Sequence, residues 1–463
     1  MPSNAHADQF AQTMSKESWV GGVRRRAGLD FHVLLTLLFR SWSIVAGGLT
    51  VMLVPSLLGK VEQGYYYTFA SLLALQIFFE LGFNQVLMQV VGHEAAHLRP
   101  EADGILRGDA RHVGRLASVV ALLHRWYAVA ALLYLVAVGT AGSVFFARSG
   151  ELPASGWAGV WWLLVACTAT NLYLSPLLAV LEGCGQIGQV ARLRLVQSLI
   201  GYLLLWAGLA LGFGLWAVAL LPAATAVCTI VWLRLAGATL RWLRTQQPAD
   251  RSLRIDWRRE ILPFQWRIAV SWISGYFIFQ LFTPLVFARQ GAVQAGRIGL
   301  ALSVFSALLT VGMSWVNAKI PAFAAHISRG ERLELNALFI SVLKRSVGFT
   351  ALASLAVLVG VFAMARLGLP GVNRIAGLPV LGCLALVSVA NSIVFAAAAY
   401  MRAHKEEPML LQSVGVGVLV LAGAWLGSMH GTLAIMSIYA AVSLLVSLPW
   451  TLHLFMRYFG RAA

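Results

Sequence analysis

Charge and cysteine are both scarce in this sequence. Only 11% of the 463 residues are charged, whereas about a quarter are charged in a typical soluble domain. The four cysteines, Cys167, Cys184, Cys228 and Cys383, stand far apart and lack the spacing of a metal site or a disulfide framework. The composition therefore disfavours a soluble enzyme, a soluble nucleic-acid-binding protein and a disulfide-stapled domain.

Long apolar runs take the place of charge. Hydrophobic residues make up 59% of the chain, and its mean hydropathy is +0.77. A helix needs about 20 mostly apolar residues to cross a bilayer. We therefore expect an all-α, polytopic membrane protein with about twelve transmembrane helices. The expected spans are 41–59, 66–91, 126–147, 157–181, 195–213, 215–233, 268–288, 298–318, 346–369, 376–400, 409–428 and 431–455.

Basic residues are distributed unevenly among the segments that join these spans. With the N-terminus inside, the inner segments contain 29 of the 35 Lys and Arg residues. Because such an excess marks cytoplasmic segments, we expect both termini to be cytoplasmic. The net charge of +17 is then mainly a sign of topology, and no nucleic-acid partner is expected. Residues 1–30 are polar, unlike a secretory signal.

A long basic segment divides the chain in two. We expect an N-terminal tail over 1–40, a six-helix lobe over 41–235, a cytoplasmic linker over 236–264 and a second six-helix lobe over 265–463. The tryptophans and arginines of the linker fit either a segment in the lipid headgroup layer or a plain solvated connection. Two parallel six-helix repeats are a recurring plan of transporters.

The two expected lobes are faintly similar where they begin. Two sequence pairs correspond, Phe39-Arg40 with Trp266-Arg267, and Gly64 followed by Asn84 with Gly296 followed by Asn317. If the halves are equivalent, Arg40 and Arg267 face one central opening, where paired guanidinium groups suit an anionic phosphate. Ordinary snorkelling of both side chains to the interface is the alternative.

Two short motifs suggest enzymes but fit poorly. His93-Glu94-Ala95-Ala96-His97 matches the H-E-x-x-H pattern of zinc hydrolases, yet no third ligand follows at the expected spacing. The segment 183–188 matches the G-x-G-x-x-G pattern of nucleotide-binding folds, which must follow a strand. Here it joins two expected membrane helices, where small residues permit a tight turn. We therefore expect no catalytic residues, no metal and no cofactor.

Polar residues form a stripe within the second expected span. Gln76, Glu80 and Asn84 recur at every fourth position, and Glu80 is the one carboxylate well inside a span. An ionised acid in the bilayer centre costs about 2.5 to 3.5 kcal/mol, so such a residue normally faces a cavity or a partner. Glu80 is either an ion-coupling group beside a cavity or a structural hydrogen-bonding residue. Gln76, Asn84 and Asn317 are further candidates for substrate binding.

Two segments of the first half carry a resemblance to a known family. They are 62–82, EQGYYYTFASLLALQIFFELG, and 181–197, LEGCGQIGQVARLRLVQ. On these residues the chain resembles the polysaccharide transporter family, the Wzx-type O-antigen flippases of the multidrug/oligosaccharidyl-lipid/polysaccharide (MOP) exporter superfamily. The first expected span lacks the acidic residue that many drug exporters of that superfamily carry there, which argues against drug/cation antiport of that type.

The resemblance implies a non-enzymatic flippase of the bacterial inner membrane. Such a protein would move an undecaprenyl-pyrophosphate-linked oligosaccharide to the outer face by alternating access, for polysaccharide or lipopolysaccharide synthesis. Its expected partners are the lipid-linked oligosaccharide, membrane lipids and polysaccharide polymerase machinery. A cation-coupled small-molecule exporter is the alternative. A membrane enzyme acting on lipid-linked glycans fits less well, because all outer loops are short.

Overall fold

The computed structural model describes residues 31–101, 105–246, 256–257, 262–404 and 408–459, and nearly all of them lie in helices. One antiparallel pair of short strands, β1 (Leu98–Pro100) and β2 (Leu106–Gly108), joins α5 to α6. The helices of the first half are α2 (Phe31–Leu57), α3 (Lys60–Leu73), η1 (Ala74–Gln76), α4 (Ile77–Glu80), α5 (Phe83–Ala95), α6 (Ala110–Ser149), α7 (Ala154–Gly183), α8 (Ile187–Ala210), α9 (Trp216–Ala236) and α10 (Ala238–Thr245).

All regular elements in the described residues of the second half are helices. Its last span is interrupted by one π-helical turn, η5. The helices are α11 (Leu262–Phe279), α12 (Phe282–Gln290), α13 (Ala292–Asn317), α14 (Ile320–Arg329), α15 (Arg332–Arg366), η4 (Pro370–Arg374), α16 (Leu378–Ala403), α17 (Leu410–Gly427), α18 (Thr432–Val442), η5 (Ser443–Ser447) and α19 (Leu448–Phe459).

The number of membrane spans agrees with the sequence. Ten helical segments of the described residues are long and apolar enough to cross a membrane. Within α2, the segment Ser41–Leu57 is a shorter apolar helix at the position of the predicted first span. The helices from α3 to α5 occupy the predicted second span. The prediction of an all-α, polytopic fold with about twelve spans is therefore confirmed. The lobe boundaries at 41–235 and 265–463 stay a prediction, and residues 1–30 of the predicted tail lie outside the described residues.

The prediction of one continuous helix over 66–91 is wrong. Leu81 and Gly82 adopt left-handed backbone conformations, with φ of 51° and 65°, so α4 ends there and α5 begins in a new direction. Left-handed residues cannot continue a right-handed helix. A side chain at position 82 would lie 2.6 Å from Ile268 of α11. The break therefore brings the first half of the chain into close contact with the helix that begins the second half.

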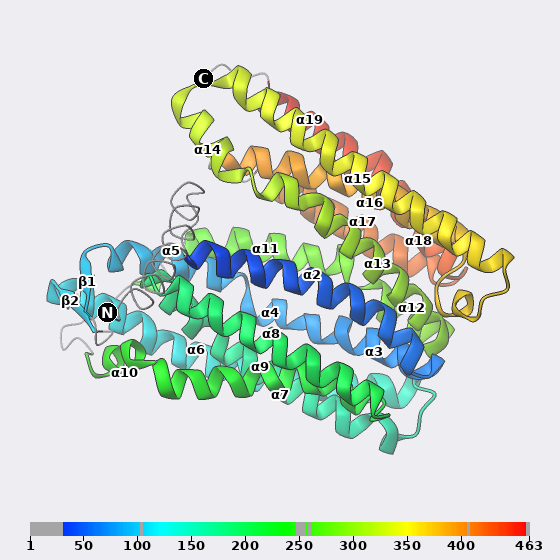
Figure 1. The fold of residues 1–463 in the computed structure, drawn as a ribbon, viewed down its shortest axis with the longest axis horizontal. Coiled ribbons are helices and arrows are strands. Elements are labelled where there is room, and N and C mark those ends of the chain that lie inside the picture. The colour runs from blue at the N-terminus through cyan, green and yellow to red at the C-terminus, as the bar shows by residue number, and fades with distance from the viewer. Residues whose placement is uncertain (1–30, 102–104, 247–255, 258–261, 405–407, 460–463) are drawn as a thin grey trace, which may run out of the picture.

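Figure 1 shows two groups of helices that meet at one end of the molecule and diverge toward the other. We call the end with β1, β2, α10 and α14 the basic end, and the end where α3 meets α13 the closed end. At the closed end, a Cβ atom on Gly64 would lie 2.0 Å from the carbonyl oxygen of Ala292, so only glycine permits this approach. Gly296 and Gly299 of α13 face α3 in the same way.

An aromatic cluster surrounds this contact. Tyr65 lies between Phe146 and Phe287, with ring centroids 5.4 and 5.1 Å away, and Trp161 packs against Phe146. All four side chains are buried. Aromatic pairs at these distances add to the free energy gained by burying their surface. The closed end is thus held by apolar packing between helices from both halves of the chain.

Candidate functional site

A cavity of about 400 Å³ lies among α5, α7, α8 and α9, and α11 closes one side of it with Trp272. Most of its polar lining comes from neutral amides and hydroxyls. The lining residues are Asn84, Met88, Asn171, Leu174, Ser175, Leu178, Ala179, Glu182, Arg194, Gln197, Thr225, Thr229 and Trp272.

Asn84 connects the helix break to this cavity. Its amide nitrogen donates to the Glu80 carboxylate at 2.7 Å and lies 2.8 Å from the Ser175 hydroxyl of α7. Its carbonyl oxygen is buried and has no hydrogen-bond partner among the described residues. A buried acceptor without a partner costs free energy, so this oxygen is suited to accept a hydrogen bond from a ligand. Asn84, predicted from the stripe, thus lies in the cavity wall.

Glu80 lies behind that wall. Its carboxylate contacts the cavity through Asn84 and does not itself line it. Gln76 belongs to the 3-10 turn η1 and is half-buried. The helix break alters the predicted stripe, because Glu80 and Asn84 lie on either side of Leu81 and Gly82. The structure places Glu80 where a change in its charge would act on Asn84 first.

One ion pair lies in the wall. The two guanidinium nitrogens of Arg194 each lie 3.1 Å from an oxygen of Glu182. The Glu182 side chain is 11% exposed and that of Arg194 is 43% exposed. Because the two charges cancel, the pair leaves the cavity without net charge while keeping several hydrogen-bonding atoms available.

The remaining predicted site residues lie outside the cavity wall. Asn317 is exposed at the end of α13, near the basic end. Arg267 is exposed near the beginning of α11, with its guanidinium carbon 5.7 Å from the Trp266 ring centroid. Arg40 belongs to α2, and its side chain lies outside the described residues. Among the predicted residues whose side chains the structure describes, only Asn84 and Glu80 are therefore in contact.

Sequence reasoning missed the polar residues of the sixth span and their partner. Thr225 and Thr229 lie one turn apart on α9, and the Gln197 amide of α8 donates to both the Thr229 hydroxyl and the Thr225 carbonyl. On α7, Asn171 and Ser175 are also one turn apart. Polar residues four apart in otherwise apolar spans were the available signal, because they lie on one helix face.

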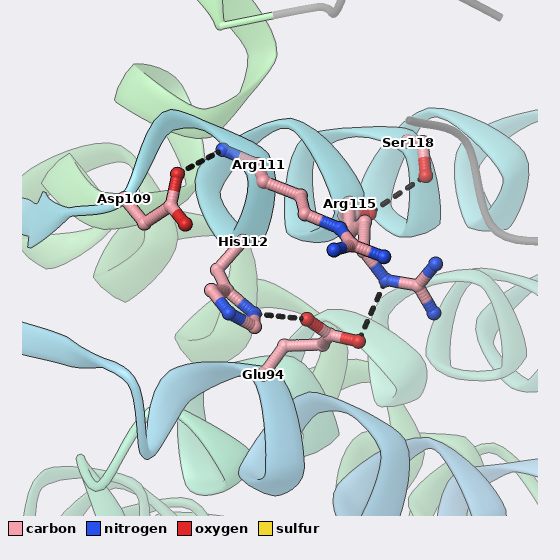
Figure 2. Close-up of polar contacts among 6 residues, drawn as sticks. All are labelled: Glu94, Asp109, Arg111, His112, Arg115 and Ser118. Carbon is pink, nitrogen blue, oxygen red and sulfur yellow. Dashed lines mark hydrogen bonds and ion pairs between the residues drawn. The ribbon is translucent and has the colours of Figure 1, made fainter. Parts of the chain in front are cut away.

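The His93–His97 motif forms a structural contact between α5 and α6. Figure 2 shows the Glu94 carboxylate bridging two side chains of α6, with His112 at 2.6 Å and Arg115 at 2.7 Å. Burial raises the pKa of the Glu94 carboxyl, but the hydrogen bonds from His112 and Arg115 outweigh burial, so its pKa lies below the ordinary value. The His97 ring stacks on His112. Glu94 therefore fixes the C-terminal end of α5 to α6.

The glycine motif is a turn, as predicted. Gly183 ends α7, Gly185 adopts a positive φ of 87°, and α8 begins at Ile187. A Cβ atom on Gly183 would lie 2.7 Å from a methyl carbon of Val91, so this glycine also permits close packing of α5. The prediction that these glycines join two membrane helices is confirmed.

Comparison of the sequence with models of known protein families finds no match, and comparison with curated proteins finds none either. Solved structures with the same fold do exist. The chain superposes on a structure described as the inward-facing conformation of a multidrug resistance MATE family transporter of the MOP superfamily. The TM-score is 0.65 and the identity 14%, over 92% of this chain and 100% of that one.

Two further MATE structures are similar. The multidrug transporter DinF-BH matches with a TM-score of 0.57 and 12% identity over 92% of this chain and 94% of its own. The eukaryotic transporter AtDTX14 matches with a TM-score of 0.55 and 13% identity over 94% of this chain and 99% of its own. These structural neighbours share an all-α, polytopic fold with this chain.

Proposed function

We propose that this protein is a membrane transporter that works by alternating access and moves an undecaprenyl-pyrophosphate-linked oligosaccharide across the bacterial inner membrane. The observation that carries the proposal is the cavity lined by neutral amides and hydroxyls from α5, α7, α8 and α9. Sugar hydroxyls lose their water when they enter a protein and need new hydrogen-bond partners. The paired Glu182 and Arg194 add such partners without adding net charge.

The arrangement of the helices supports alternating access. The two helix groups meet at the closed end and diverge toward the basic end (Figure 1). In this proposal the arrangement corresponds to a state that faces the basic end, the side that the charge distribution predicts to be cytoplasmic and where a lipid-linked glycan is made. Transport requires the contact between α3 and α13 to separate, which would open the close approach of Gly64 to Ala292 and break the hydrogen bond from the Gln63 amide to the Gly296 carbonyl.

The pyrophosphate is expected to lie nearer the basic end than the sugars. Arg267 precedes Trp272 of the cavity wall by five residues, about 7.5 Å along α11. Arg40, near the same end of α2, is its proposed counterpart. Together they would bind the negative charge while Gln76, Asn84 and Asn317 contact polar groups of the substrate. The lipid tail would stay in the bilayer.

A cation-coupled exporter of small molecules is the second candidate. The MATE structures that share the fold are described as multidrug transporters. Glu80 also supports this function, since a carboxylate bonded to the cavity wall through Asn84 could exchange a proton for a cationic substrate. No catalytic function is proposed, because the polar residues of the cavity include no nucleophile paired with a base.

Flipping in proteoliposomes tests the proposal. The experiment measures how much fluorescent lipid-linked oligosaccharide becomes accessible to an external glycosidase. The variant Gln197→Leu/Thr229→Val removes both members of one cavity pair, so no polar group is left unpaired. We expect about tenfold slower flipping at unchanged melting temperature, the size of effect that follows from losing about 1.4 kcal/mol of binding.

A matched pair outside the cavity provides the control. Gln412 and Ser447 form an equivalent buried hydrogen bond of 2.9 Å between α17 and η5. Gln412→Leu/Ser447→Ala is expected to leave flipping unchanged. Equal rates for both double variants would remove the cavity from the proposal. Export of a lipophilic organic cation by wild-type protein that does not flip lipid-linked glycan would establish the second candidate instead.

A further inference from the structure

A second cavity, of about 390 Å³, lies at the basic end, between α6, α7 and α10. It is separate from the cavity described above, because the two cavities share no lining residue. Its lining is Ala121, His124, Arg125, Tyr173 and Arg244. Two arginines, a histidine and a phenol therefore meet in a space whose wall, among the described residues, contains no acidic side chain.

The hydrogen bonds in this cavity leave it rich in donors. The Arg244 guanidinium lies against Nε2 of His124, and Nδ1 of His124 is 2.7 Å from the Tyr173 hydroxyl. A guanidinium cannot accept a hydrogen bond, so Nε2 is the acceptor and the ring is neutral, with its proton on Nδ1. Nδ1–H then donates to the Tyr173 oxygen, and the phenolic proton stays available to a ligand.

Neither arginine is neutralised within the described part of the chain. Arg125 and Arg244 are exposed, and neither forms an ion pair with a described carboxylate. The available groups are thus two guanidiniums and one hydroxyl. Oxygen-rich anions, above all phosphate groups, are the ligands that such donors recognise.

The surroundings of the cavity indicate how such an anion would reach it. Arg125 and Trp126 begin an exposed stripe on α6 that continues through apolar side chains toward the closed end. The Trp126 ring packs against Trp257 of the linker at 5.9 Å between centroids, and indoles favour the membrane–water interface. The apolar members of the stripe are Val129, Leu132, Leu133 and Val136, each more than half exposed.

We propose that this cavity binds the phosphate of an anionic phospholipid from the adjoining leaflet, with the acyl chains along the exposed stripe of α6. Arg125, Arg244 and Tyr173 would bind the headgroup. The site is independent of the transported substrate, since it lies outside the cavity proposed to bind that substrate. Its occupation would fix α10, and with it the beginning of the linker, against α6 and α7.

Native mass spectrometry of the full chain with dioleoyl phosphatidylglycerol tests this site. Each basic residue at a membrane surface strengthens binding of anionic lipid by about fivefold. Arg125→Gln/Arg244→Gln is therefore expected to weaken binding of this lipid by about 25-fold. The control Arg99→Gln/Arg111→Gln removes the same charge from exposed residues at the same end, and neither residue lines the cavity, so it is expected to change binding less than twofold.

Further measurements distinguish the phosphate of a lipid from free inorganic phosphate. Tyr173→Phe removes only the hydroxyl donor and is expected to weaken lipid binding by about fivefold without a change in charge. Dioleoyl phosphatidylcholine should bind weakly, and millimolar inorganic phosphate should displace little phosphatidylglycerol, since it lacks acyl chains. Equal lipid binding by wild-type protein and Arg125→Gln/Arg244→Gln, or an equal loss in the control, would overturn the proposal. Displacement by phosphate alone would identify a free-anion site instead.

Discussion

The closed end and the basic end are held together by different kinds of contact. At the closed end, Gly64 and Gly296 let two helix backbones touch, and the Gln63 amide donates to the carbonyls of Gly296 and Arg374 at 2.9 and 3.0 Å. At the basic end, charged side chains line cavities or form pairs such as Glu94 with Arg115. The closed end therefore depends on close backbone packing supported by hydrogen bonds of a neutral amide, and the basic end depends more on charged side chains, so substitutions should affect them by different mechanisms.

The largest expected effect comes from Gly64→Ala, which breaks the closed end. The new methyl group would lie 2.0 Å from the Ala292 carbonyl oxygen, a contact that requires α3 and α13 to separate. We expect a loss of about 1 to 3 kcal/mol in stability, as for other overpacked sites, and transport reduced more than tenfold. Melting temperature and glycan display measure the two effects.

Gly47→Ala is the control for this prediction. Gly47 lies in α2, and a Cβ atom there would have no neighbour within 4 Å. Because both changes raise helix propensity alike, any difference between them reports the contact alone. If Gly64→Ala is as stable and active as Gly47→Ala, the α3–α13 contact does not hold the closed end together.

Glu80→Gln tests the carboxylate beside the helix break. Gln can still accept the hydrogen bond from Asn84 but cannot titrate, so insertion and folding should be retained. If Glu80 couples transport to an ion, the rate falls about tenfold and its dependence on pH flattens. The exposed Glu334→Gln is the control. Transport unchanged at every pH would leave Glu80 a structural residue.

Glu94→Gln should weaken the basic end in a pH-dependent way. The pKa of Glu94 is lowered in the folded protein, so its contribution is fully present at neutral pH and is lost as pH falls through that lowered value. We expect a loss of about 2 kcal/mol at pH 7, from two charge-assisted hydrogen bonds. The difference in melting temperature from wild type should shrink below about pH 4.

Glu101→Gln serves as the matched control for Glu94. Glu101 pairs with Arg107 at 3.0 Å across the β1–β2 hairpin, but both side chains are largely exposed. Exposed pairs contribute about 0.2 to 1 kcal/mol, so this change should have a small effect at any pH. Equal destabilisation by the two variants would show that burial does not strengthen the Glu94 cluster.

The smallest expected effect is that of Arg267→Ala, about threefold less glycan display at unchanged protein level, and Arg40→Ala should act similarly. The size corresponds to one exposed cation contacting a phosphate. Arg289→Ala is the control, because Arg289 lies over Trp425 at 5.1 Å much as Arg267 lies over Trp266, but at the closed end. Wild-type display in Arg267→Ala and Arg40→Ala would remove both residues from the proposed site.

Part of the candidate site could be read from the sequence. Asn84 and Glu80 stood out because polar residues are rare in apolar spans, and both lie at or behind the cavity wall. Gln197 and Thr229 did not stand out, because an amide or hydroxyl in a span is more often a link between helices. Only their position on adjacent helices facing the same space distinguishes them from pairs such as Gln412 and Ser447.

The apolar runs alone determined that the chain is an all-α membrane protein with about twelve spans, because crossing the hydrocarbon layer requires a fixed length of apolar helix whatever its neighbours are. The tertiary structure decided where the second span breaks and which polar side chains share a cavity. Leu81 and Gly82 hold left-handed conformations against α11, nearly 200 residues away in sequence. Such contacts depend on the packing of distant helices, and no local pattern of residues specifies that packing.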